Sequence, residues 1–121
     1  MNRQETGMLG ERLAREFLIE QGYQIKETNY RCPYDEIDII AQDEDYLVFV
    51  EVRTKRSLEF GTPEQSLTPA KMSHLRAASA HYLQAQGDIC VPCRIDVVAI
   101  ELTREGKPSR MELIKNAIGG N

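Results

Sequence analysis

Two short segments of alternating apolar residues, only two residues apart, constrain the fold of this chain more than any other feature. Residues 36–43 place apolar side chains on one face of an extended segment, at Ile37, Ile39 and Ala41. Residues 46–53 do the same at Val48, Val50 and Val52. A period of two is typical of β-strands, and a connection of two residues predicts an antiparallel hairpin.

The hairpin predicts which side chains face each other. Closed between Asp43 and Tyr46, it brings the two apolar sets together on one face, and a shift of one residue would scramble both faces. The same register puts Asp38 directly opposite Glu51 on the other face. Directly opposed side chains have Cβ atoms about 4.5–5.5 Å apart, so two carboxylates at these positions repel each other.

Two explanations of this carboxylate pair stay open. In the first, Arg53 on the same strand face forms an ion pair with one of these acids or with Glu36. In the second, a divalent cation lies between Asp38 and Glu51, since Mg²⁺ commonly binds one or two carboxylates and completes its shell with water. Glu11, at the border of the apolar arc of a predicted N-terminal helix, is either a further ligand or a boundary glutamate paired with Arg15.

The remaining segments complete an α/β order. Helices are predicted over residues 7–21 and 69–86, the second with Thr68 as N-cap and Pro69 in its first turn. Further strands are predicted over residues 23–30, 94–102 and, at the edge, 111–114, with loops over 31–35 and 54–67. Segments 46–53, 69–86 and 94–102 predict a right-handed βαβ crossover. The order α-β-β-β-α-β predicts one α/β domain over residues 1–121, with a mixed central sheet flanked by helices and a core at about residues 7–102.

Charge and composition narrow the function classes. The net charge of −4 excludes a protein that holds nucleic acid by bulk positive charge. Residues 11–51 hold 11 acids and 4 bases, whereas residues 52–110 hold 9 bases and 6 acids, which leaves a basic stretch beside the acids. Three cysteines argue against a disulfide framework, and no segment has the roughly 18 apolar residues of a membrane span. We therefore expect a cytoplasmic protein without membrane contact.

Short motifs follow one another along the chain. They are Gly10-Glu11, Gly22-Tyr23, Asn29-Tyr30-Arg31, Glu36-Ile37-Asp38-Ile39-Ile40-Ala41 and Val48-Phe49-Val50-Glu51-Val52-Arg53, continued by Gly61, Lys71, Tyr82-Leu83 and Arg94-Ile95-Asp96-Val97-Val98. Over about residues 7–102, this order and spacing resembles the YraN-type family of small, uncharacterised bacterial proteins. That family is similar to the PD-(D/E)xK restriction-endonuclease-like nucleases, close to the archaeal Holliday-junction resolvases.

The resemblance implies a restriction-endonuclease-like fold and a role for each acid. Asp38 and Glu51 match the two acids of the motif and form its catalytic set with Arg53, and Glu11 matches a further helix glutamate of many such nucleases. Glu11, Asp38 and Glu51 would hold Mg²⁺ or Mn²⁺. The implied activity is Mg²⁺-dependent endonucleolytic hydrolysis of phosphodiester bonds in structured or branched DNA, and a homodimer is compatible with it. The residues implied to bind nucleic acid are Arg53, Lys55, Arg56, Lys71 and Arg76.

Arg53 departs from the motif, which has lysine at this position. Arginine keeps the charge and binds phosphate through its planar fork, but it cannot act as a neutral amine. Lys71 matches a position that the family tends to keep basic, whereas Asp35 stands where the family more often has glycine. The alternative function is therefore a catalytically weak or inactive module that binds nucleic acid or a partner and retains the nuclease fold.

Overall fold

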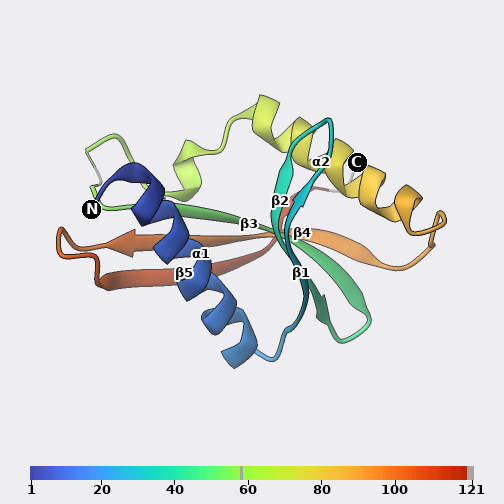
Figure 1. Cartoon of the computed structure of the whole chain (residues 1–121), viewed down its shortest axis with the longest axis horizontal. Coiled ribbons are helices and arrows are strands. Elements are labelled where there is room, and N and C mark those ends of the chain that lie inside the picture. The colour runs from blue at the N-terminus through green and yellow to red at the C-terminus, as the bar shows by residue number, and fades with distance from the viewer. Residues whose placement is uncertain (58, 120–121) are drawn as a thin grey trace.

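Five strands form one mixed sheet, and a helix packs on each of its faces (Figure 1). The computed structural model describes residues 1–57 and 59–119. Its elements are α1 (Arg3–Glu20), β1 (Gln24–Arg31), β2 (Glu36–Asp43), β3 (Tyr46–Lys55), a 3₁₀ turn (Glu64–Ser66), α2 (Pro69–Ala85), β4 (Cys93–Leu102) and β5 (Pro108–Ile118). The strand order is β1-β2-β3-β4-β5, with β3 and β4 parallel and the other neighbours antiparallel. This confirms the predicted α/β class and mixed sheet, and it agrees with a restriction-endonuclease-like fold.

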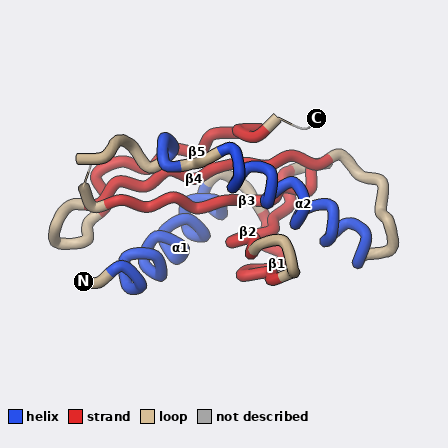
Figure 2. The backbone as a smooth tube through the Cα atoms, turned by 90° about the horizontal axis from the view of Figure 1, so that it is seen from above, coloured by secondary structure: helices blue, strands red, loops and turns tan. Residues whose placement is uncertain are grey.

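Alternate residues of the central strand β3 face different helices. Figure 2 shows these two helices, α1 and α2, lying apart from each other along the sheet. On one side β3 packs against α1, in a cluster that includes Val48, Val50, Ala14 and Leu18. On the other side it packs against α2, in a cluster that includes Phe49, Leu75, Ala78 and Tyr82. Because β3 is apolar on both faces along most of its length, it occupies the centre of the sheet. Its charged residues come only toward its C-terminal end, which is where a polar site can form.

The hairpin of β2 and β3 has the predicted register over five pairs that end at Ile39–Val50. Beyond this pair, the Asp38 carboxylate accepts a hydrogen bond from the backbone N–H of Val52 at 2.8 Å. The expectation that Ile37 shares a face with Ile39 is wrong, because Ile37 packs in the cluster on the α2 side. We attribute the change to β2 turning away from β3 at Asp38, where a side chain takes the place of a backbone partner. The two strands therefore part at the position of the acids.

Three elements differ from the expectations by more than one residue. α1 begins at Arg3 rather than at residue 7, because Asn2 and Glu5 form a reciprocal capping box with hydrogen bonds of 2.8 and 2.9 Å. Within the predicted loop 54–67, β3 continues to Lys55 and a 3₁₀ turn follows. The last strand is also longer than the predicted 111–114, because it pairs along most of β4 and its backbone bonds do not depend on apolar side chains.

Both edge strands of the sheet are irregular. In β1, the pairing with β2 shifts between Ile25 and Glu27, and Asn29 has a left-handed backbone with φ of 53°. In β5, Asn116 has φ of 51° and lies where the pairing with β4 shifts. Asparagine adopts this conformation more readily than most residues other than glycine. Each edge is thus bent at a residue that tolerates the bend.

Asp96 of β4 is completely buried and carries a charge into the interior. Its carboxylate accepts hydrogen bonds from the Tyr23 hydroxyl at 2.7 Å, from Arg94 Nε at 3.0 Å and from the Asn116 backbone N–H at 2.9 Å. Arg94 also donates to Asp43 at 2.6 Å. Burial, together with the bond to Asp96, raises the pKa of the Tyr23 hydroxyl. This network ties the start of β1 and the β2–β3 turn to β4 and β5.

Two expectations from composition concern cysteines and membranes. Cys32, Cys90 and Cys93 are free cysteines in this structure. Among the helices of residues 1–57 and 59–119, none has the length and apolar character needed to cross a membrane. The fold is held by the two apolar clusters and the network around Asp96.

Gly10 allows α1 to approach β3 closely. A Cβ atom at this position would lie 2.0 Å from the Thr54 hydroxyl oxygen, whereas one at Gly7 would meet nothing within 4 Å. We expect Gly10→Ala to lower the free energy of unfolding by about 1–3 kcal/mol, because the helix or Thr54 must move. Gly7→Ala is the matched control and should raise it by up to about 1 kcal/mol, since alanine favours a helix more than glycine does. Urea denaturation measures both variants, and equal effects would contradict the close contact.

Candidate functional site

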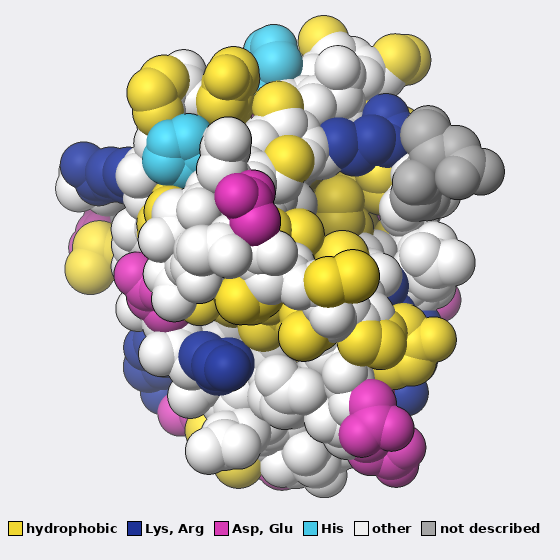
Figure 3. Space-filling view, turned by 90° about the vertical axis from the view of Figure 1, so that its right-hand side faces the viewer, with side chains coloured by type: hydrophobic (Ala, Val, Ile, Leu, Met, Phe, Trp, Pro, Cys, Tyr) yellow, Lys and Arg dark blue, Asp and Glu magenta, His cyan; other side chains and the backbone are white. Residues whose placement is uncertain are grey.

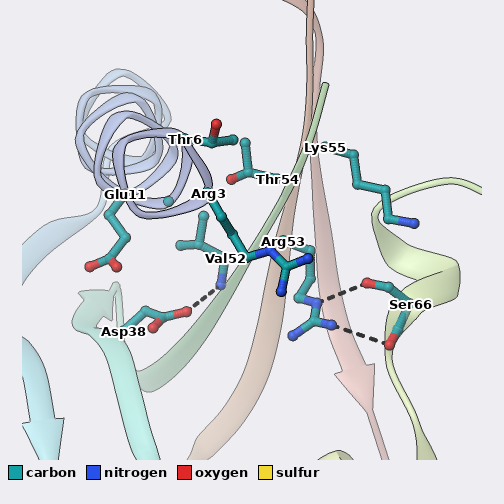
Figure 4. Close-up of a pocket in the computed structure, with 10 residues that line it drawn as sticks. Arg3, Thr6, Glu11, Asp38, Val52, Arg53, Thr54, Lys55 and Ser66 are labelled. Atoms are coloured by element: carbon teal, nitrogen blue, oxygen red, sulfur yellow. Dashed lines mark hydrogen bonds between the residues drawn. The ribbon is translucent and has the colours of Figure 1, made fainter. Parts of the chain in front are cut away.

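A cavity of about 480 Å³ opens between the N-terminal half of α1 and the C-terminal end of β3 (Figure 4). It is lined by Arg3, Thr6, Gly7 and Glu11 from α1, Asp38 from β2, Val52, Arg53, Thr54 and Lys55 from β3, and Ser66 from the 3₁₀ turn. The cavity therefore brings two of the predicted metal ligands, Glu11 and Asp38, together with two of the predicted phosphate-binding residues, Arg53 and Lys55.

Asp38 and Glu51 are neighbours where β2 and β3 part. Glu51 is only 3% exposed, and Asp38 is half-buried with one oxygen bonded to the Val52 N–H. Burial and the nearby charge of Glu51 raise the pKa of the Asp38 carboxyl well above its ordinary range, although the bond from Val52 opposes this. The charge of Glu11 acts in the same direction as that of Glu51. Two ionised carboxylates are therefore unfavourable here unless a cation offsets them.

Two side-chain cations contact Glu51. Its Oε2 atom lies 3.0 Å from Arg53 Nη1 and 3.8 Å from Lys71 Nζ. The Arg53 ion pair offered by the sequence as one explanation is thus present. Lys71 comes from the first turn of α2, where its backbone N–H donates to the N-cap Thr68 at 3.1 Å. The crossover helix therefore delivers a second cation to the acids on the sheet.

Asp35 holds Lys71 in this position. Lys71 Nζ lies 3.0 and 2.9 Å from the two carboxylate oxygens of Asp35. Burial alone would raise the pKa of the Asp35 carboxyl, but the hydrogen bonds from Lys71 and from the Glu36 N–H, together with the charge of Lys71, outweigh it and lower that pKa. Asp35 and Lys71, separated by 36 residues in the sequence, form an ion pair beside Glu51.

Arg53 is anchored as well as charged. Its Nε donates to the Ser66 hydroxyl at 3.0 Å and its Nη2 to the Ser66 carbonyl at 3.2 Å, as the dashed lines of Figure 4 show. The 3₁₀ turn that carries Ser66 is fixed in turn by Arg110, which bonds Glu64 at 2.7 and 3.1 Å. These bonds lower the pKa of Glu64 to about 2. The guanidinium of Arg53 is therefore fixed in place by several hydrogen bonds.

Glu11 reaches the cavity from α1. In Figure 4 its carboxylate and that of Asp38 point toward the same space from the helix and from β2. Its Oε1 atom accepts a hydrogen bond from the side-chain amide of Asn29 at 2.8 Å. Of the two interpretations of Glu11 from the sequence, the structure favours a residue directed toward the acids over one paired with Arg15.

The other predicted phosphate-binding residues are distributed unevenly. Lys55 lines the cavity, and Arg56 donates to the carbonyl oxygens of Met1 at 2.7 Å and Arg104 at 3.2 Å. Arg76 lines a separate cavity of about 230 Å³ between α2 and the strands β4 and β5. Figure 3 shows the end of the molecule away from the N-terminus, where basic and acidic side chains are scattered among hydrophobic and uncharged groups. The basic residues near Asp38 and Glu51 therefore come from β3 and from the first turns of α1 and α2.

Three residues of the site escaped the sequence argument. Arg3 enters the cavity because α1 begins one turn earlier than expected, and the capping box that extends the helix is visible in the sequence. Asn29 belongs to a quoted motif, but no pattern indicates its bond to Glu11. Ser66 contacts Arg53 through the path of a loop, which leaves no periodic signal.

Mg²⁺ or Mn²⁺ is the cofactor that the resemblance implies, and the donor set matches it in part. Within residues 1–57 and 59–119, no three His, Cys, Asp or Glu side chains are grouped closely enough to hold an ion between them. Asp38 and Glu51 alone match the common Mg²⁺ arrangement of one or two carboxylates completed by water. Glu11 faces the same space from the helix. The residues thus fit a hydrated cation rather than one enclosed by protein ligands.

Comparison with known proteins finds relatives along nearly the whole chain. A family model described as "Uncharacterised protein family UPF0102" matches residues 10–100. A UPF0102 protein of Dehalococcoides mccartyi is 52% identical over 118 residues, which cover 98% of this chain and 96% of the relative. A UPF0102 protein of Moorella thermoacetica is 44% identical over 117 residues, which cover 97% of this chain and 98% of the relative. The matched segment contains every predicted site residue from Glu11 to Arg76.

Proposed function

This chain belongs to the uncharacterised protein family UPF0102, which is the YraN-type family that its motifs predicted, and we propose its function from its own site. The proposed function is that of a metal-dependent endonuclease that hydrolyses phosphodiester bonds of structured or branched DNA. The observation that carries it is the pair of Asp38 and Glu51 where β2 and β3 part, beside a cavity that holds basic side chains.

The energetic cost of this pair supports a cation site. Burial of acids next to each other is unfavourable, and a strongly perturbed carboxyl group in a cavity is a recognised sign of a functional site. Apolar residues of similar volume would pack at these strand positions without that cost. Asp38 and Glu51 would hold Mg²⁺ with water in the remaining positions. When bound, the ion would activate a water molecule and polarise the phosphoryl oxygen.

The basic residues suit a phosphodiester substrate. Lys55 and Arg3 line the same cavity as Glu11 and Asp38, where they would bind phosphates of the substrate backbone. Arg53 uses three of its five N–H groups on Ser66 and Glu51, which leaves two for a phosphate oxygen among the contacts of the described residues. The nuclease motif has its lysine at the position that Arg53 occupies on β3. In this chain, Lys71 of α2 brings an amine next to Glu51 instead.

One observation favours a second candidate function, a non-catalytic module that binds nucleic acid or a partner. Arg53 and Lys71 already offset the charge of Glu51 without any metal. In this alternative, Arg3 and Lys55 bind a phosphate backbone, and no bond is cleaved.

Cleavage assays separate the two functions. The purified protein is incubated with a supercoiled plasmid, a synthetic four-way junction, a linear duplex and a single-stranded RNA, each with Mg²⁺, Mn²⁺ or EDTA. We expect metal-dependent cuts, with the four-way junction cleaved faster than the linear duplex of the same arm sequence. Binding of the junction in a gel-shift assay, with no product in Mn²⁺ after prolonged incubation, would favour the non-catalytic module. Faster cleavage of the RNA would reassign the substrate class.

A further inference from the structure

Asn29 connects Glu11 to the sheet. Its side-chain nitrogen donates to Glu11 Oε1 at 2.8 Å and to Glu36 Oε1 at 2.9 Å. An amide group carries two N–H donors, so each carboxylate takes one. The second oxygen of Glu36 lies 3.3 Å from Arg31 Nε, which offsets the charge at that end. At the other end, the bond fixes one oxygen of Glu11 and with it the direction of the carboxylate.

The location of Asn29 relates this bond to the acids. The residues on either side of Asn29 pair with the residues on either side of Asp38, so the two positions are neighbours across β1 and β2. Asn29 has a left-handed backbone, at φ of 53°, in the middle of a strand. Residues in sparsely populated backbone conformations cluster at functional sites.

We propose that Asn29 is a positioning residue that holds the Glu11 carboxylate toward Asp38, where Glu11 adds a third negative charge beside the hydrated cation site. The inference rests on the proposed function, because the cation gives this orientation its purpose. Without Asn29, Glu11 is free to pair with Arg15, four residues along the same helix face, which is the contact expected for an isolated helix. Glu11 and Arg15 both line a neighbouring cavity of about 350 Å³, so the space for that rotation exists. The hydrogen bond that the Asn29 side chain donates from β1 to Glu11 prevents this rotation.

A merely structural role for Asn29 makes a different prediction. Asparagine is common at positive φ, so the residue could serve the backbone of β1 alone. Glycine adopts the same backbone conformation and lacks the amide. Asn29→Gly therefore removes the bond to Glu11 and keeps the conformation of the strand. A comparison of metal binding with stability in this variant separates the two roles.

Calorimetric titration of the full-length protein with Mn²⁺ is the test. The proteins are the wild type, Asn29→Gly, Glu11→Gln, the double variant of these two, and Glu36→Gln as the matched control that shares the same amide. We expect Asn29→Gly to weaken Mn²⁺ binding about tenfold, as is usual when an outer hydrogen-bonding partner of a metal site is lost. Glu36→Gln should change it by less than about twofold. Because Asn29 acts through Glu11, the double variant should bind Mn²⁺ as weakly as Glu11→Gln and no more weakly.

Each other outcome has a definite meaning. Equal Mn²⁺ affinity in the wild type and Asn29→Gly would overturn the inference and leave the proposed function intact. Additive losses in the double variant would also overturn it, since Asn29 would then act independently of Glu11. A wild type that takes up no Mn²⁺ would overturn the proposed function and this inference with it. Thermal unfolding in EDTA confirms that each variant is folded before its titration is interpreted.

Discussion

Replacement of Asp38 by asparagine is expected to reduce Mg²⁺-dependent cleavage about 100- to 1,000-fold while the protein remains as stable as the wild type in EDTA. Asparagine keeps an oxygen that accepts the Val52 N–H but loses the charge that would hold the cation. It also removes one of two neighbouring carboxylates whose repulsion and burial raise the pKa of Asp38. A variant that loses activity without losing stability is characteristic of residues that serve a site rather than the fold.

The measurement compares cleavage rates with chemical denaturation in EDTA. Glu16→Gln is the control, because Glu16 lies on the same helix as Glu11 but forms an exposed pair with Arg12. Its cleavage and stability should both match the wild type. Glu51→Gln should lose activity too but destabilise the fold by about 1–3 kcal/mol, since Arg53 and Lys71 lose their nearly buried partner and keep only Ser66 and Asp35. Full cleavage by Asp38→Asn would contradict the assignment of the site.

Replacement of Asp96 by alanine is expected to lower the free energy of unfolding by about 3–5 kcal/mol, the largest effect on stability that the structure predicts. The change leaves the largely buried Arg94 guanidinium with Asp43 and the Tyr23 hydroxyl as hydrogen-bond partners but without the buried Asp96 carboxylate, and it removes the acceptor of the Tyr23 hydroxyl. The backbone N–H of Asn116 loses its acceptor as well. Stabilities of small domains lie at about 5–15 kcal/mol, so Asp96→Ala is close to the limit of folding.

A milder variant keeps this prediction measurable. Tyr23→Phe removes two hydrogen bonds, one donated to Asp96 and one accepted from Arg94, and keeps the aromatic ring in the core, so it should cost about 1–2 kcal/mol. Urea denaturation at neutral pH measures both variants. If the free energies of unfolding of Asp96→Ala and Tyr23→Phe differed by less than about 1 kcal/mol, the network would contribute little beyond single hydrogen bonds.

Features set by local sequence pattern were predictable in this fold. The alternation in residues 36–43 and 46–53 predicts the hairpin, and its register over five pairs is as expected. The pattern fails at Ile37 because the twist of β2 and the bond from Asp38 to the Val52 N–H are tertiary events. The capping box at Asn2 was visible in the sequence, since it needs only two residues at fixed spacing.

Contacts made between distant segments could be predicted only in part. Proximity of Asp38 to Glu51 follows from the hairpin alone. The approach of Lys71 to Glu51 depends on where the crossover helix packs, and its bond to Asp35 adds a partner from a loop. The anchoring of Arg53 by Ser66 depends on a loop path that has no periodicity. The roles of these residues toward DNA and metal remain predictions that the experiments above decide.

The irregular edge strands have a consequence for how copies of this protein meet. A regular exposed strand edge offers free N–H and C=O groups to another chain and so promotes sheet extension and aggregation. Here Asn29 in β1 and Asn116 in β5 have a left-handed backbone conformation that departs from a regular strand. Charged side chains such as Glu27 and Lys115 lie close to them in the sequence. The same bends that shape the candidate site in β1 thus limit growth of the sheet beyond five strands. Association of two copies is therefore expected to use a surface other than the strand edges.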